Sequence, residues 1–153
     1  MINCYIRSLL VILSALMLWG CLPNNNQLTI EQKDGRSVKF TVETALTAKE
    51  QSQGLMNINQ MAGDAGMLFV FEDESFRSFW MKNTLIPLDI LFINKGGVIG
   101  HIHHHATPND LTSIPSQVPS MYALEINGGM SAKLGISVGD KVFHYNIKRT
   151  LAQ

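Results

Sequence analysis

The residues best suited to chemistry lie in the segment Phe79–Ile93, which reads FWMKNTLIPLDILFI. Lys82, Asn83 and Asp89 interrupt an otherwise apolar stretch, and burial penalises such groups unless they are paired. Trp80 adds a large aromatic surface beside them. Apolar walls with a few placed polar groups are typical of a small-ligand pocket. The segment is therefore the first candidate for a site.

A second carboxylate, Glu125, stands between two apolar residues of another predicted strand. One interpretation is a structural network, in which Lys82 pairs with Asp89 or Glu125. Buried pairs of this kind are weak evidence for catalysis. The other is a site with a carboxylate as ligand anchor or general base, Lys82 as charge partner and Trp80 as stacking wall. The candidate ligand-binding residues are Trp80, Lys82, Asn83, Asp89 and Glu125, and no catalytic residue is assigned.

The run HIHHH places His101, His103 and His105 on one face of a predicted strand. Spacing of two residues along a strand can bring two imidazoles to one metal ion. Apart from Asp110 in the following loop, no acidic or thiol ligand stands nearby. We predict no metal site and no cofactor, and these histidines are the candidates for a metal-binding alternative.

Several functional classes leave no trace in the chain. No Gly-x-Ser-x-Gly elbow, phosphate loop or dinucleotide fingerprint is present. Lys plus Arg and Asp plus Glu both number 12, so the basic excess expected of a nucleic-acid partner is missing. The methionines are interpreted as adaptable core filler.

The elements around these residues are mostly short strands. Alternating or continuous apolar runs predict strands, and Asp34-Gly35 predicts a hairpin turn. Thr47 to Glu50 form a capping box for a helix of about two turns, which Gly54 would close. We predict a mainly β domain, a β-sandwich or barrel-like fold with one or two short helices. The predicted strands cover 27–32, 36–44, 66–71, 79–84, 89–94, 98–105, 121–126 and 141–147, and 106–120 is predicted to be a loop.

The first residues are typical of a secretory signal. An apolar run at 8–19 follows a short basic start and is too short to span a bilayer. The Cys21 that follows Gly20 resembles a bacterial lipobox, although Trp19 is bulkier than usual there. We predict a signal peptide at 1–20, a tether at 21–27 and one domain at 28–150. A lipid on Cys21 would hold the domain in the periplasm, and Leu22 favours the outer membrane.

The order WMKNT at 80–84 followed by PLD at 87–89 resembles one family, the domain of unknown function 192. The resemblance extends over Gln27 to Ile147 and implies a single compact β-rich domain whose biochemical role is unassigned. Members commonly carry arginines around the GLM motif, where this chain has Gln51, Gln53 and Ile58. The other matching motifs are GLM at 54–56, GMLFVF at 66–71, LEINGG at 124–129 and LGISVGDKV at 134–142.

The sequence thus predicts an envelope lipoprotein with a non-enzymatic role, a module that binds a small ligand or an envelope protein. The alternative is a small hydrolase or lyase with Asp89 or Glu125 as general base. Because that chemistry requires a carboxylate that solvent can reach, the burial of these two residues separates the two functions.

Overall fold

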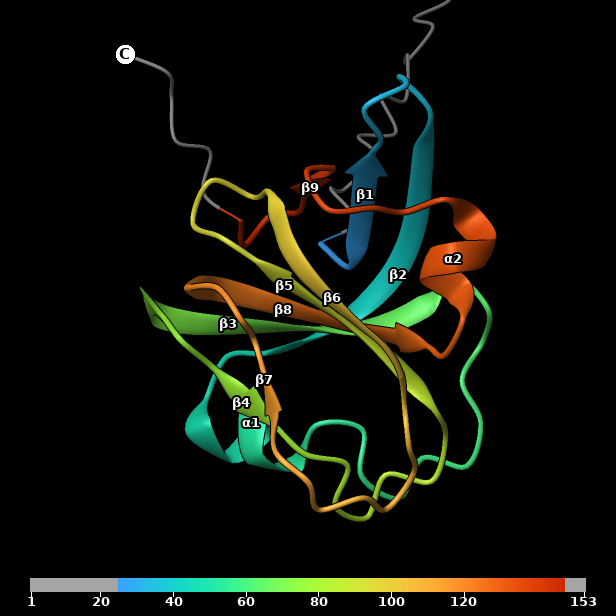
Figure 1. Ribbon diagram of the computed structural model, residues 1–153, viewed down its shortest axis with the longest axis vertical. Coiled ribbons are helices and arrows are strands. Elements are labelled where there is room, and N and C mark those ends of the chain that lie inside the picture. The colour runs from blue at the N-terminus through green and yellow to red at the C-terminus, as the bar shows by residue number, and fades with distance from the viewer. Residues whose placement is uncertain (1–24, 148–153) are drawn as a thin grey trace, which may run out of the picture.

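One seven-stranded sheet organises the structure, a computed structural model that describes residues 25–147 (Figure 1). The strands are β1 (Gln27–Glu31), β2 (Ser37–Ala45), β3 (Ala65–Ser75), β4 (Ser78–Phe79), β5 (Leu88–Ile93), β6 (Ile99–Ala106), β7 (Ile114–Pro115), β8 (Ser120–Asn127) and β9 (Lys141–Phe143), and the helices are α1 (Ala48–Gln53) and α2 (Met130–Leu134). The sheet has the order β6-β5-β8-β3-β2-β1-β9, and β4 pairs with β7 in a separate two-stranded ribbon. Only β2 and β3 pair in parallel within this sheet.

The sheet curls so that its two ends approach each other. Ile99 N–H donates to the carbonyl of Asp140 at 3.0 Å, and Val142 N–H donates to the carbonyl of Gly97 at 2.7 Å. These bonds join the start of β6 to the segment around β9, although the two strands lie at opposite ends of the sheet order. The result is a half-barrel, which confirms the mainly β, barrel-like prediction (Figure 1).

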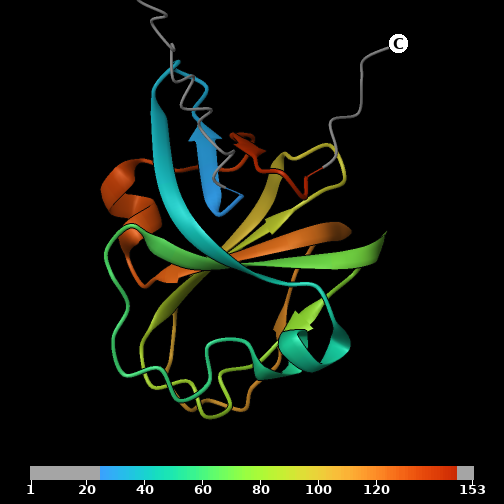
Figure 2. The ribbon, with the colours of Figure 1, turned by 180° about the vertical axis from the view of Figure 1, so that it is seen from behind.

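Both faces of the sheet are covered, and each carries its own apolar core. Leu68, Leu91 and Leu124 belong to one core, together with residues of β1, β2 and β9. Phe69 and Ile90 belong to the other core, which packs under α1 and the long connections. Figure 2 shows α1 and these connections on one side of β3 and β8, with β1 and β9 on the other. Because β5 lies between two cores, all six of its residues are buried.

The local signals of the first part of the chain are confirmed. β1 and β2 form an antiparallel hairpin, with Gly35 at φ +86° in its turn. Thr47 caps α1: its Oγ1 accepts a hydrogen bond from Glu50 N–H, and the Glu50 carboxylate accepts one from Thr47 N–H. Gly54 is the C-cap of this helix.

The predicted strand at 79–84 is wrong, since β4 ends at Phe79. The chain then turns: Thr84 N–H donates to the carbonyl of Met81 at 3.1 Å, and Asn83 adopts φ +54°. The alternation of faces expected along this segment is therefore absent. Met81 and Thr84 are buried, whereas Trp80 is half exposed at 49%.

Two further boundaries differ from the predictions. The last strand is three residues long rather than seven, and the predicted loop at 106–120 contains β7. The expected signal peptide at 1–20, Cys21 and the first residues of the tether lie outside the described residues. Within 25–147, no helix is long and apolar enough to cross a bilayer.

Candidate functional site

Asp89 lies in the interior and is fully hydrogen-bonded. Its Oδ1 accepts from the backbone N–H groups of His105 and Gly129, both at 2.9 Å, and its Oδ2 accepts from Ser131 N–H and Oγ. Burial by itself opposes ionisation, but the bonds from Ser131, Gly129 and His105 hold the pKa of Asp89 below its usual value. Since Asp89 has no exposed surface, it joins β5, β6 and α2 as a structural carboxylate.

A bulge in β6 makes this arrangement possible. Leu88 pairs with Ala106 and Ile90 pairs with His103, so two steps along β5 face three steps along β6. The extra residue re-aims the strand, and His105 takes up the left-handed conformation at φ +52°. Its N–H consequently points at Asp89 instead of continuing the sheet ladder.

Ser131, His104 and Asp89 lie within hydrogen-bond reach, yet they do not form a nucleophilic site. His104 Nδ1 lies 3.0 Å from Ser131 Oγ, and that hydroxyl donates to Asp89 at 2.6 Å. A catalytic serine needs its hydroxyl proton directed at the base and its oxygen open to substrate. Ser131 has no exposed surface and directs its proton at the carboxylate. This contact stabilises α2 against β6.

The three candidate histidines do not converge on one metal position. His101 stacks on the Phe92 ring, with centroids 5.9 Å apart. His105 lies against Gly129, and its partner in the hydrogen-bond network is Asp89. Among residues 25–147, no three His, Cys, Asp or Glu side chains are grouped closely enough to hold a metal ion.

Trp80, Lys82 and Asn83 gather away from Asp89. The Lys82 ammonium lies 5.1 Å from the Trp80 ring centroid, a cation–π distance. The Asn83 carbonyl accepts from Asn57 N–H at 2.8 Å, which ties this turn to the segment after α1. In the described part of the chain, both ion pairs lie elsewhere, so Lys82 pairs with neither candidate carboxylate.

Glu125 is the buried carboxyl that lacks partners. It lies on β8, only 5% of its surface is exposed, and no donor in the described residues reaches its oxygens. Burial raises the pKa of Glu125 to about 8, so the group is protonated at neutral pH. A protonated carboxyl donates hydrogen bonds and acts as an acid, not as a base.

Glu125 lines a recess of about 30 Å³, which has room for a water molecule or a small polar head group. Trp80 and Lys82 line the same recess, so three of the five candidate residues meet there. Gly54 closes one wall: a Cβ at this position would lie 3.9 Å from Glu125 Oε2 and 3.3 Å from Phe69 Cζ.

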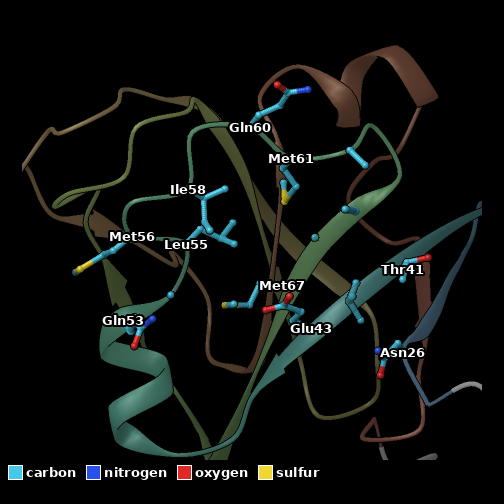
Figure 3. Close-up of a pocket in the computed structure, with 15 residues that line it drawn as sticks. Asn26, Thr41, Glu43, Gln53, Leu55, Met56, Ile58, Gln60, Met61 and Met67 are labelled. Carbon is cyan, nitrogen blue, oxygen red and sulfur yellow. The ribbon is translucent and has the colours of Figure 1, made fainter.

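A larger pocket of about 480 Å³ adjoins this recess, and residues 53–56 line both hollows. The pocket lies between the sheet and the segment that follows α1 (Figure 3). Glu43 and Met67 form part of the sheet side, and the carboxylate of Glu43 lies beside the Met67 side chain (Figure 3). The main apolar side chains of the lining are Leu55, Met56, Ile58, Met61 and Met67, and its polar ones are Asn26, Thr41, Glu43, Gln53 and Gln60.

The register of the sheet connects the pocket with Glu125. Glu43 of β2 pairs with Met67 of β3, and Met67 pairs with Glu125 of β8. Directly paired residues project from the same face of a sheet. The three side chains therefore form one row, with a carboxyl group on each side of the methionine.

Sequence reasoning missed Glu43 and the methionines of this pocket. Met61 and Met67 were interpreted as core filler, although both are only partly buried. The alternation in β2 indicates that Glu43 faces outward from the barrel core. No local signal shows that this outer face is itself covered by another segment.

Comparison with known proteins places this architecture in a family. Residues 29–144, more than half of the chain, match the family described as DUF192, uncharacterized ACR. The chain belongs to the DUF192 family. No match was found among curated proteins.

Two crystal structures resemble this DUF192 chain over most of its length. One is a protein of Sinorhizobium meliloti, provisionally named a transcription regulator. It is 41% identical with a TM-score of 0.77, and the match covers 78% of this chain and 93% of that one. The other, a protein of unknown function from Novosphingobium aromaticivorans, is 39% identical with a TM-score of 0.74. That match covers 76% of this chain and 83% of that one.

Proposed function

We propose that this DUF192 protein is a non-enzymatic binding module that holds a small ligand in the pocket between β2, β3 and the segment after α1. The pocket carries this proposal. Its volume of about 480 Å³ lies within the range of about 300–1,000 Å³ found for small-molecule sites. Its lining combines apolar side chains with a few polar groups, as such sites usually do.

The methionines support the same function. Met56, Met61 and Met67 are flexible and polarisable, and such side chains adapt their shape to a bound molecule. Met61 lies on the connection after α1 and Met67 on β3, whereas the Met56 side chain points away from Met67 (Figure 3) and its sulfur lies 4.0 Å from Asn83 Nδ2. Rotamer changes of these side chains can adapt the wall of the pocket to a ligand.

The proposed setting is the bacterial envelope. The apolar run at 8–19 and Cys21 support a diacylated anchor, and two acyl chains hold a protein stably at a membrane. The domain would face the periplasm, from the outer membrane in preference to the inner one. A role in transcription, as in the provisional name of the Sinorhizobium protein, has less support, because the chain has no basic excess for DNA.

A hydrolase or lyase has less support than binding. The four hydrogen bonds to Asp89 leave it neither exposed nor free to accept a substrate proton. Glu125 is mostly protonated at neutral pH, so only a minor fraction is the carboxylate that a general base requires, and its residue is 5% exposed. A ligand that needs no chemical change fits this pair of carboxyl groups better than a substrate does.

Native mass spectrometry of the full chain, purified from membranes in mild detergent, tests the binding function. We expect a small molecule to remain bound to the wild-type protein. Ala65→Phe fills the pocket from β3 and should remove that molecule, whereas Ala132→Phe, on the exposed side of α2, should retain it. A wild-type protein that carries no molecule, or an Ala65→Phe variant that keeps it, would contradict the proposal.

A further inference from the structure

The charges of the residues that line the pocket do not suit an anionic ligand. Among the described residues that line the pocket, Glu43 alone has an ionisable side chain, and none is a lysine, arginine or histidine. Lys82 lines the adjoining recess together with Glu125, and its ammonium group lies 5.1 Å from the Trp80 ring centroid. An anionic ligand would meet a carboxylate, amides and one hydroxyl group in the pocket but no cation, so the charge pattern among the described residues favours a cationic ligand.

Glu125 supplies a second, independent indication of a ligand. Only 5% of the Glu125 residue is exposed, its side chain lines the recess, and no donor in the described chain bonds its carboxyl group. Buried polar groups in proteins are nearly always satisfied, and an exception calls for a missing partner. The recess of about 30 Å³ beside it accepts one small polar group.

The distance between the two carboxyl groups defines the shape of that ligand. Glu43 and Glu125 lie two strands apart on one face, which corresponds to about 10 Å between their backbones. Met67 lies between them and offers an apolar surface. A cation at each carboxylate and a hydrocarbon chain over the methionine would match this row.

We infer that the pocket binds a linear aliphatic diamine, with one ammonium group at Glu43, the other in the recess at Glu125, and the methylene chain on Met67. This inference rests on the proposed binding function and names its ligand class. The ammonium in the recess donates the hydrogen bonds that Glu125 lacks. Glu43 is exposed and contributes less, because solvent screens its charge.

Binding of a diamine should displace the proton of Glu125. At pH 7 Glu125 is mostly protonated, and pairing with an ammonium group requires the carboxylate. Each diamine bound should thus release close to one proton from Glu125 at pH 7 and almost none at pH 9. Three other ionisable side chains lie around Glu125: Glu43 two strands away, His103 two strands away through Ile90, and Lys82 in the lining of the recess.

Isothermal titration calorimetry of the intact chain in an uncharged detergent tests the inference. The probes are 1,4-diaminobutane, the neutral 1,4-butanediol and the anionic succinate, each measured in phosphate and in Tris at pH 7 and pH 9. We expect binding of the diamine alone, with release of a proton at pH 7. Affinity should rise between pH 7 and pH 9, because the proton no longer has to be displaced.

Three variants locate the two ends of the ligand. Glu125→Gln should weaken diamine binding at least tenfold and abolish the proton release, since it removes a buried charge partner. Glu43→Gln should weaken binding about two- to fivefold and keep the proton release. Glu31→Gln, an exposed glutamate of β1 outside the pocket, should change neither. Thermal melting of each variant checks that it is folded.

The outcomes separate this inference from the proposed function. Binding of the diol or of succinate with the affinity of the diamine, lost in Ala65→Phe, would overturn the ligand class and leave the pocket a binding site. Diamine binding that Glu125→Gln leaves unchanged would also overturn the inference. If no probe binds and no molecule co-purifies with the wild-type chain, the binding function fails as well.

Discussion

Ser131 donates both its backbone N–H and its hydroxyl to Oδ2 of Asp89, at 2.9 and 2.6 Å. This pair joins residues 42 positions apart and attaches α2 to the most buried strand of the sheet. Hydrogen bonds to an ionised acceptor are stronger than neutral ones. Asp89, the carboxylate in the apolar run LDILFI, therefore has a structural role.

Replacement of this carboxylate tests the structural role. Asp89→Asn introduces an amide that can accept on one side only, so its NH₂ group faces either the N–H groups of His105 and Gly129 or the N–H of Ser131. We expect a loss of about 3 kcal/mol or more in the free energy of unfolding, measured by urea denaturation at pH 7. Asp34→Asn, at an exposed turn, should cost less than about 1 kcal/mol.

An unchanged urea midpoint for Asp89→Asn would contradict this role. The pKa of Asp89 is lowered in the folded protein, so its contribution is present above the unfolded pKa of 3.8 and is lost on acidification below it. The difference in stability between wild type and Asp89→Asn should therefore shrink as the pH falls toward 3.

Glu125 gives the opposite pH dependence. Its folded pKa of about 8 exceeds the value of 4.5 for an unperturbed glutamate. Between these values the unfolded chain releases the proton and the folded chain keeps it, so stability falls as the pH rises from about 5 to about 8. The expected loss is on the order of 4 kcal/mol, measured by urea denaturation across this range.

The variant Glu125→Gln isolates this effect, because glutamine has the shape of the protonated acid and does not titrate. Its stability should stay nearly level between pH 5 and pH 8 relative to wild type. Glu43→Gln, on the same face but exposed, should keep the wild-type slope. Equal slopes for Glu125→Gln and wild type would show that Glu125 is ionised in the folded state at neutral pH.

The sequence predicted those parts of the fold that depend on local chemistry. The hairpin at Gly35, the capping box at Thr47 and the buried strand β5 follow from turn residues, caps and apolar runs. The strand predicted through Thr84 failed for a physical reason. Met81 is buried although it lies at the start of a turn, and an apolar residue in a sequence does not show whether it is buried in a turn or in a strand.

The sequence singled out individual residues of the candidate site but did not predict how they lie relative to one another. Glu125 stood out as a carboxyl group in an apolar strand, and it is the buried one without partners. Its relation to Glu43 through Met67 depends on the parallel pairing of β2 with β3. That pairing joins strands separated by α1 and a long connection, and no local pattern specifies its register.

The membrane anchor is tested at Cys21, outside the described residues. Cys21→Ser removes the thiol that would carry the diacylglyceryl group, so the chain should lose its lipid and its membrane attachment. We expect wild type to incorporate labelled palmitate and to sediment with membranes, and the variant to do neither. Incorporation of label into Cys21→Ser would contradict the lipoprotein assignment, and Cys4→Ser serves as the matched control.

Gly54 offers a way to close the recess without touching Glu125. Its φ of +46° strains any L side chain, and a Cβ would lie 3.3 Å from Phe69 Cζ and 3.9 Å from Glu125 Oε2. Gly54→Ala should lower stability by about 1–3 kcal/mol and weaken binding of 1,4-diaminobutane, measured by urea denaturation and calorimetry. Gly35→Ala is the matched control, since Gly35 has φ +86° and open space around its Cβ position. It should show the backbone strain and full binding, and equal binding by both variants would exclude the recess as the place of the ammonium group.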